Sequence, residues 1–272
     1  MRENTKPVND GKIKRGDSVY MMKEGDMSSK VLLIIHGLGE HSGRYRNLVK
    51  IALKHGYGVV TFDLPGHGKS PGIRGHAPLK KVLRIVDNLA KETAEPPVIF
   101  GHSLGGLIAA RYAELGGRLK GLILSSPGLS YDKSKVSDSL VNLAKFLSFI
   151  VPFLTMDNKI DPNKLSRNEK AVERYVNDPL VHRRISVALA RDFFLESEKA
   201  IKEAEKISVP VLLLIGTADE VTPPDGARKF YENLRVHTKR KIEFEGGYHE
   251  LFEDPEHSRN FYDEIEKFLV EV

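Results

Sequence analysis

A serine stands at a sharp junction in this chain. The stretch 96–112 reads PPVIFGHSLGGLIAARY, in which an apolar run leads directly into GHSLG (101–105) and then into a helical pattern. The spacing G-x-S-x-G between a buried strand and a helix is typical of a turn that presents a serine hydroxyl. Gly101 and Gly105 remove side chains that would clash there, and the helix start directs its N–H groups to the same point. This context favours Ser103 as a nucleophile over an incidental serine in a glycine-rich turn.

A serine hydroxyl is a weak nucleophile until a base removes its proton. In this strand–turn–helix context the order along the chain is Ser, then an acid, then His. Of the ten histidines, His237, His249 and His257 lie beyond a plausible acid. His237 belongs to a basic segment and His257 opens the last expected helix, whereas His249 follows the last expected strand at its carboxyl end. We therefore predict that His249 is the base. The alternative is a loop histidine bonded to backbone.

The acid should follow the preceding strand. The segment LLLIGTADEVTPP places Asp219 first after the strand and its turn, with Glu220 next to it. We predict Asp219 as the carboxylate that orients the histidine and keep Glu220 as the alternative. Asp63 also ends an expected strand, but it precedes the serine. In FDLPGHGKS, we interpret Asp63, His67 and Ser70 as residues that fix a loop.

Attack on a carbonyl creates an oxyanion that needs hydrogen-bond donors. Leu104, directly after the serine, supplies one backbone N–H. A second donor is expected from the loop after an earlier strand, and IIHGLGEHSG fits this position. There His36 and Gly37 turn the chain, so that the N–H of Leu38 faces the site. The prediction concerns backbone geometry and does not depend on either leucine side chain.

The elements that position these residues alternate along the chain. Short apolar runs, each ending in a turn signal, predict strands over 31–37, 57–68, 97–103, 119–128, 209–219 and 239–247. Helical patterns between them predict helices over about 44–55, 79–92, 104–115, 224–235 and 257–271. Continuous apolar strands that alternate with helices are typical of a sheet covered on both faces. We therefore predict an α/β fold with a mostly parallel central sheet flanked by helices.

The alternation breaks once. Between Pro127 and about Ser208 the sequence shows helical patterns and no convincing strand. Ligands bind at the carboxyl ends of the strands in an open α/β sheet, so an insertion leaving from that edge would cover the site. The sequence thus predicts two core segments, 1–127 and 209–272, and a helical cap or lid over 128–208.

Bulk properties exclude several classes of protein. The formal net charge is +5, but basic and acidic residues are interleaved along the chain, which favours a solvated surface over a nucleic-acid-binding one. The absence of cysteine excludes a disulfide framework, a thiol nucleophile and a Cys-ligated metal. The N-terminus lacks the apolar core of a signal peptide, and the apolar run 146–156 is too short to span a bilayer. These observations predict a soluble, cytoplasmic protein whose serine chemistry needs no metal or organic cofactor.

Several segments carry a family resemblance that covers nearly the whole chain. They are HGLGEHSGRY, DLPGHGKSPG, GHSLGG, LSRNEKAVERYVNDPL and GTADEVTPP. They resemble the monoacylglycerol lipases and lysophospholipases of the α/β-hydrolase superfamily. The resemblance implies a triad of Ser103, Asp219 and His249, with Leu38 and Leu104 at the oxyanion positions. It also implies that the insertion caps an acyl tunnel.

The resemblance extends to residues that would contact the alcohol part of the substrate. Glu40 and Arg44, in GEHSGR, match polar residues that line the glycerol end of the family's pocket, and Tyr175 matches a cap tyrosine near the same end. One departure concerns the second histidine that animal members carry three residues after the catalytic one. Here HELF places Phe252 at that position.

An apolar stripe in the insertion has two interpretations. Phe146, Phe149, Ile150 and Phe153 adjoin a first apolar face at helical spacing, and Pro152 should kink or end the helix. The stripe either lines an acyl pocket or makes a peripheral contact with a membrane or lipid surface. The alternative is that it packs against the rest of the cap.

Together, the motifs and the resemblance predict a serine carboxylic-ester hydrolase. The expected reaction cleaves monoacylglycerols to fatty acid and glycerol through an acyl-serine intermediate. A lysophospholipase and a general esterase of short-chain esters would use the same triad with another pocket. A non-catalytic binding module would be expected to lose a triad member or the oxyanion turn, and neither is lost. The expected partner is a small lipid ester and not a nucleic acid, and the sequence predicts no oligomeric state.

Overall fold

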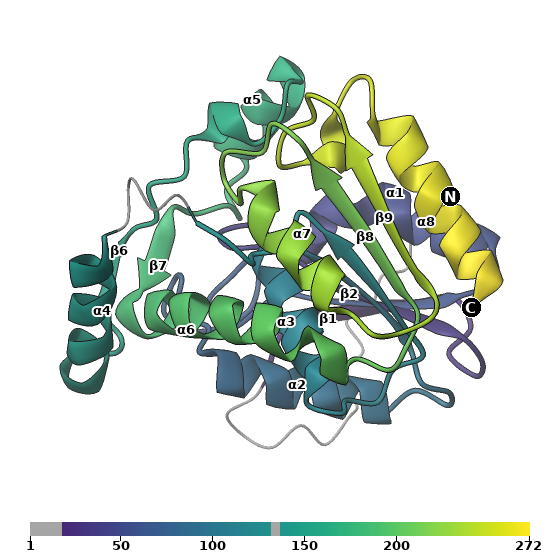
Figure 1. Cartoon of the computed structure of the whole chain (residues 1–272), viewed down its shortest axis with the longest axis horizontal. Coiled ribbons are helices and arrows are strands. Elements are labelled where there is room, and N and C mark those ends of the chain that lie inside the picture. The colour runs from purple at the N-terminus through teal and green to yellow at the C-terminus, as the bar shows by residue number, and fades with distance from the viewer. Residues whose placement is uncertain (1–17, 132–136) are drawn as a thin grey trace.

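The structure is a computed structural model that describes residues 18–131 and 137–272. Within these ranges, seven strands form one sheet in the order β1-β3-β2-β4-β5-β8-β9 (Figure 1). The strands are β1 (Met21–Glu24), β2 (Val31–Ile35), β3 (Gly58–Phe62), β4 (Val98–His102), β5 (Gly121–Ser125), β8 (Val211–Gly216) and β9 (Lys239–Phe244). Only the edge pair β1–β3 is antiparallel among these neighbours; the other neighbours pair in parallel. The predicted α/β fold with a mostly parallel sheet is confirmed.

Helices cover both faces of the sheet because the strand side chains alternate between two apolar cores. The helices are α1 (Arg46–Lys54), α2 (Leu79–Lys91), α3 (Leu104–Glu114), α7 (Pro224–Asn233) and α8 (Ser258–Glu271). In β2, Leu32 and Ile34 join the core formed with α1 and α8, whereas Leu33 and Ile35 join the core formed with α2, α3 and α7. Continuous apolar runs in the sequence therefore correspond to strands buried on both faces.

Between β5 and β8 lies the insertion, in the teal and green part of Figure 1. Its elements are α4 (Asp138–Ile150), β6 (Thr155–Asp157), the 3-10 helix η2 (Pro162–Lys164), α5 (Glu169–Asn177), β7 (Arg184–Ser186), α6 (Val187–Glu203) and the 3-10 turn η3 (Ala204–Lys206). Two further 3-10 turns lie in the core, η1 (Ser42–Tyr45) and η4 (Leu251–Glu253).

The sequence missed the short strands. It predicts no strand within 128–208, yet β6 and β7 pair antiparallel there, and it does not predict β1. Strands of three or four residues with partly exposed side chains carry too few alternations to show a pattern. Pairing with a neighbour, rather than local sequence, defines them.

The insertion is not separate from the core along its whole length. Leu189 and Ala200 of α6 belong to the same buried cluster as side chains of α3 and α7. The division of the chain at residues 127 and 208 stays a prediction, and residues 1–17 and 132–136 of its segments lie outside the described ranges. Among the described residues, none of the helices is long and apolar enough to cross a membrane.

Candidate active site

Ser103 lies on the turn between β4 and α3 in a strained backbone conformation. Its φ is 52° and its ψ is −118°, a region that costs a non-glycine residue about 1–3 kcal/mol. A Cβ on Gly101 would collide with the carbonyl oxygen of Gly105, and a Cβ on Gly105 would collide with that of Ile35. The Ser103 carbonyl oxygen accepts a hydrogen bond from the backbone N–H of Gly128 at 2.8 Å. The two glycines therefore let the turn pack closely enough to present the serine.

A buried Asp–His pair lies beside this turn. Nδ1 of His249 is 2.8 Å from Oδ2 of Asp219, and both side chains are buried. Oδ1 of Asp219 accepts hydrogen bonds from the N–H groups of Val221 at 2.8 Å and Thr222 at 2.9 Å, which fix the carboxylate. A neutral His249 that donates from Nδ1 keeps Nε2 as an acceptor. Ser103 and His249 line the same cavity of about 20 Å³, so both side chains border one space.

Thr222 is a residue of this site that the sequence reasoning missed. Its Oγ1 lies 3.0 Å from Oδ2 of Asp219 and 3.2 Å from Nδ1 of His249. The same oxygen is 3.1 Å from the carbonyl oxygen of Ser126, to which it donates a hydrogen bond. The available signal was a threonine three residues after the acid, since such hydroxyls bond locally in turns.

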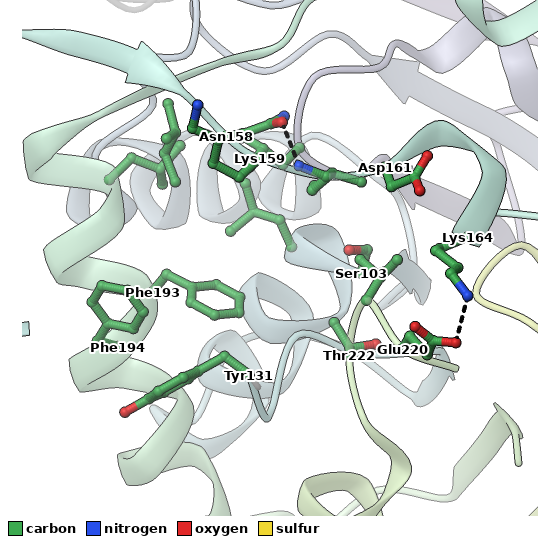
Figure 2. Close-up of a pocket in the computed structure, with 16 residues that line it drawn as sticks. Ser103, Tyr131, Asn158, Lys159, Asp161, Lys164, Phe193, Phe194, Glu220 and Thr222 are labelled. Atoms are coloured by element: carbon green, nitrogen blue, oxygen red, sulfur yellow. Dashed lines mark hydrogen bonds and ion pairs between the residues drawn. The ribbon is translucent and has the colours of Figure 1, made fainter. Parts of the chain in front are cut away.

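Glu220, the alternative acid, pairs with a lysine and not with the histidine. Its carboxylate forms an ion pair with Nζ of Lys164 at 2.7 Å, as the dashed line in Figure 2 marks. The side chain is half exposed, whereas Asp219 is buried against the imidazole. The geometry therefore favours Asp219. The rejected histidines also lie elsewhere: His237 is exposed, and Nε2 of His257 bonds the carbonyl oxygen of Glu245 at 2.8 Å.

The segment after β3 has the loop-fixing role that the sequence indicates. Asp63 accepts hydrogen bonds from the N–H and the hydroxyl of Ser42 and from the N–H of Lys69. The hydroxyl of Ser70 donates to the carbonyl oxygen of Asp63 at 2.6 Å. His67 bonds the carbonyl oxygen of Pro65 at 3.0 Å.

The two backbone positions predicted for an oxyanion hole border the serine. Leu104 is the first residue of α3, and the first N–H groups of a helix have no partner within the helix. Gly37 approaches so closely that a Cβ there would lie 3.1 Å from the Cβ of Ser103. Nε2 of His36 accepts from the N–H of Leu64 at 2.9 Å, so its Nδ1–H donates to the Gly37 carbonyl oxygen at 2.7 Å. The donor roles of Leu38 and Leu104 stay predictions.

The polar residues matched to a glycerol site lie together. Glu40 and Tyr175 line the small cavity with Ser103 and His249, and the guanidinium of Arg44 lies 4.9 Å from the Tyr175 ring centre. Burial opposes ionisation of Glu40, but the charge of Arg44 and the groups around it lower the pKa of Glu40 to about 2. Glu40 is therefore ionised at neutral pH.

A larger cavity of about 260 Å³ extends from Ser103 into the insertion. Figure 2 shows the rings of Phe193, Phe194 and Tyr131 together, across the cavity from Ser103. Apolar lining comes from Leu38, Leu104, Tyr131, Ile160, Ile185, Leu189, Phe193, Phe194 and Val221. The sequence did not single out the residues of α6 or of the segment 158–164, because their helical or irregular patterns do not show which side faces a cavity.

The apolar stripe, which consists of three residues of α4 and Phe153 just beyond it, lies elsewhere. The exposed fractions are 61% for Phe146, 82% for Phe149, 61% for Ile150 and 60% for Phe153. None of these four side chains lines the large cavity, so the prediction that they line an acyl pocket is wrong. The face of α4 that is buried carries Val141 and Ser148, and α4 packs against α6. Helical spacing defined the stripe but could not show which face turns inward.

A serine on a tight strand-to-helix turn, beside a buried Asp–His pair at the carboxyl edge of a mostly parallel sheet, defines a serine hydrolase of the α/β-hydrolase fold. Comparison with known proteins agrees. Residues 26–256 match the family model described as serine aminopeptidase, S33, and the chain belongs to this family.

Two relatives and one solved structure illustrate the likeness. Phospholipase YtpA of Bacillus subtilis is 33% identical over 86% of this chain and 92% of its own. Monoglyceride lipase of Homo sapiens is 34% identical over 88% of this chain and 82% of its own. The crystal structure of Paleococcus ferrophilus monoacylglycerol lipase is 48% identical, covers 93% of this chain and 99% of that chain, and has a TM-score of 0.90.

The Asp–His geometry predicts unequal effects for two neighbouring acids. Asp219→Asn should lower kcat on a p-nitrophenyl ester by about 10⁴-fold, because the amide no longer holds His249 in the required tautomer. Glu220→Gln, which removes only the exposed pair with Lys164, should stay within about threefold of wild type. The assignment is wrong if Glu220→Gln causes the larger loss.

The burial and pairing of His249 predict the pH dependence. Burial lowers its pKa, but the Asp219 carboxylate together with Glu250 and Glu40 more than offsets this, and the net pKa is raised. A general base acts only when neutral, so kcat/KM should reach half its plateau above pH of about 6.5, the ordinary histidine value. In Asp219→Asn this acid limb should move to lower pH. A wild-type limb centred well below 6.5 would contradict the assigned base.

Proposed function

We propose that this chain hydrolyses monoacylglycerols to a fatty acid and glycerol through an acyl-serine intermediate. The observation that carries the proposal is the pair of cavities bordering Ser103. One is about 260 Å³ with a largely apolar lining, and the other is small and has Glu40 and Glu250 among its lining residues. The large cavity suits a single acyl chain, and the small cavity has no room for a second acyl chain. The likeness to the human and Paleococcus ferrophilus enzymes supports the same substrate class.

The proposed mechanism uses the triad in its expected roles. His249 takes the proton of Ser103 through Nε2 as the serine Oγ attacks the ester carbonyl. The N–H groups of Leu38 and Leu104 stabilise the oxyanion. His249 then protonates the leaving glycerol oxygen, and water activated by His249 hydrolyses the acyl-serine. Asp219 holds the imidazole and stabilises its charged form throughout. These steps need no metal or organic cofactor.

We further propose that the segment 128–208 acts as a cap. It contributes Ile160, Ile185, Leu189 and Phe193 to the large cavity, while the core contributes Ser103 and Leu104. Without these side chains the acyl-binding side would open to solvent. The cap therefore supplies the acyl specificity and the core supplies the chemistry.

A lysophospholipase is the alternative suggested by the likeness to phospholipase YtpA. The carboxylates of Glu40 and Glu250 line the small cavity and would repel the phosphate of a lysophospholipid. A neutral alcohol such as glycerol carries no charge for these carboxylates to repel. A general carboxylesterase would favour the shortest acyl chains, for which the large cavity has no use.

An acyl-length series tests the substrate class. The rate of wild type should be highest on medium or long monoacylglycerols and should exceed its rate on lysophosphatidylcholine. In Ser103→Ala the rate should fall by at least about 10³-fold. In Phe193→Ala, the lost ring should move the optimum to longer chains, because Phe193 lines the cavity across from the serine. A peak at the shortest chains, with poor turnover of monoacylglycerols, would indicate a general carboxylesterase.

We also propose that the exposed apolar stripe of α4 and the segment that follows it rests on a lipid surface. Phe146, Phe149, Ile150 and Phe153 are exposed, together with Leu143, Leu154 and Met156 nearby. Such a run exceeds the scattered apolar residues of an ordinary surface. Because α4 packs on α6, whose residues line the large cavity, contact here would bring the cavity close to the source of the substrate. The partner is the bilayer or micelle that holds the monoacylglycerol.

The surface contact predicts a loss of binding to phosphatidylcholine vesicles. Phe146→Ser with Phe149→Ser should weaken cosedimentation at least tenfold, since burial of each phenylalanine contributes about 1.5–3 kcal/mol. Leu115→Ser changes an exposed leucine outside the insertion and should leave vesicle binding unchanged. Both proteins should hydrolyse a dissolved short-chain ester at the wild-type rate. Equal vesicle binding by all three proteins would refute the contact.

A further inference from the structure

Arg44 holds two buried carboxylates that belong to different loops of the site. Its Nη1 lies 2.8 Å from Oε2 of Glu40 and 2.6 Å from Oε1 of Glu250, and its Nη2 lies 2.7 Å from Oε2 of Glu250. The side chains of Arg44, Glu40 and Glu250 are 9%, 4% and 3% exposed. A bidentate pair of this kind fixes geometry as well as charge.

Each carboxylate is connected to a different part of the machinery. Oε1 of Glu40 accepts a hydrogen bond from the N–H of Gly37 at 2.6 Å, at the turn that leads into Leu38. Glu250 is the residue directly after His249. The guanidinium therefore links the proposed oxyanion turn to the histidine loop through two side chains.

The guanidinium of Arg44 packs against other side chains of the protein and does not line the small cavity. The ring of Tyr175 lies 4.9 Å and that of Phe252 5.6 Å from the guanidinium carbon. Glu40 and Glu250 line the small cavity beside the serine, whereas Arg44 is not among its lining residues. At the position of the departure noted in HELF, Phe252 packs on the guanidinium, and Glu250 in the same segment supplies its charge partner.

The carboxylates also affect the charge balance at the histidine. Burial lowers the pKa of His249, Asp219 raises it, and Glu250 and Glu40 raise it further. Arg44 offsets only one of the two negative charges. Removing the charge of Glu250 should therefore move the acid limb of the rate profile to lower pH.

We infer that Glu250 is a positioning residue, which through Arg44 holds the His249 loop at a fixed place relative to the Gly37–Leu38 turn. The inference rests on the roles proposed above for His249 and this turn. A second anchor comes from the insertion, since the N–H of Glu250 donates to the carbonyl oxygen of Leu165 at 2.7 Å. The side chain acts by aligning base and oxyanion donors and not by binding the alcohol.

The test compares Glu250→Gln on two esters that differ in their alcohol. Glutamine keeps the size of the side chain but offers Arg44 a single acceptor oxygen and no charge. On both p-nitrophenyl butyrate and a monoacylglycerol, kcat should fall by roughly 10- to 100-fold, as expected for a small misplacement of catalytic groups. KM should stay within threefold, and the acid limb should move to lower pH.

Two further variants separate alignment from charge and from general damage. Glu250→Asp keeps the charge but is too short for the bidentate pair, so the acid limb should stay near wild type while kcat falls. Glu253→Gln makes the same change in the next turn, where Glu253 pairs with Arg174 at 2.7 Å, and should keep wild-type activity. Thermal unfolding of each protein verifies the fold, and Glu250→Asp carries the test if Glu250→Gln does not fold.

A loss confined to the monoacylglycerol and expressed in KM would overturn the inference, because it would make Glu250 a residue that binds glycerol. Unchanged kcat on both esters would also overturn it. A different result is expected if monoacylglycerols are not the substrates. In that case wild type would not hydrolyse monoacylglycerols, while the comparison of variants on p-nitrophenyl butyrate would still report on alignment.

Discussion

The close approach of α3 to the sheet is the constraint on which the site depends. The carbonyl oxygen of Ile35 at the end of β2 leaves no room for a side chain at Gly105, and the carbonyl oxygen of Gly105 leaves none at Gly101. The chain between these glycines must turn within a few residues, so Ser103 takes a positive φ. The helix then starts beside the ends of the central strands, where the other loops of the site also begin. The strain at one residue is maintained by the packing of a whole helix against the sheet.

The sequence could place the three residues of the proposed triad at one edge of the sheet, because each follows the end of a parallel strand. Strand order fixes which loops share an edge, and the types of Ser103, Asp219 and His249 limit the chemistry. The same argument did not reach Thr222 or Glu250, because their roles come from side-chain contacts with neighbours far apart in the chain. Nor did the sequence show which carboxylates pair with Arg44.

The insertion was harder to predict for a different reason. A helix with apolar residues on adjoining faces can bury either one, and the choice for α4 is made by its packing against α6 rather than by its own pattern. The actual cavity lining, such as Ile160 and Phe193, lies on segments with no distinguishing sequence signal. The short strands β6 and β7 likewise exist because they pair with each other.

The hydrogen bond from Glu250 to the carbonyl oxygen of Leu165 has a consequence for how such a protein can change over evolution. It makes the backbone of the insertion part of the support of the residue next to His249. Under the roles proposed for the cap and for Glu250, exchange of the insertion would alter more than acyl preference. A replacement that lacks a carbonyl at this place would also alter the rate of the chemical step. With these roles, a change in the insertion would affect substrate range and turnover at the same time.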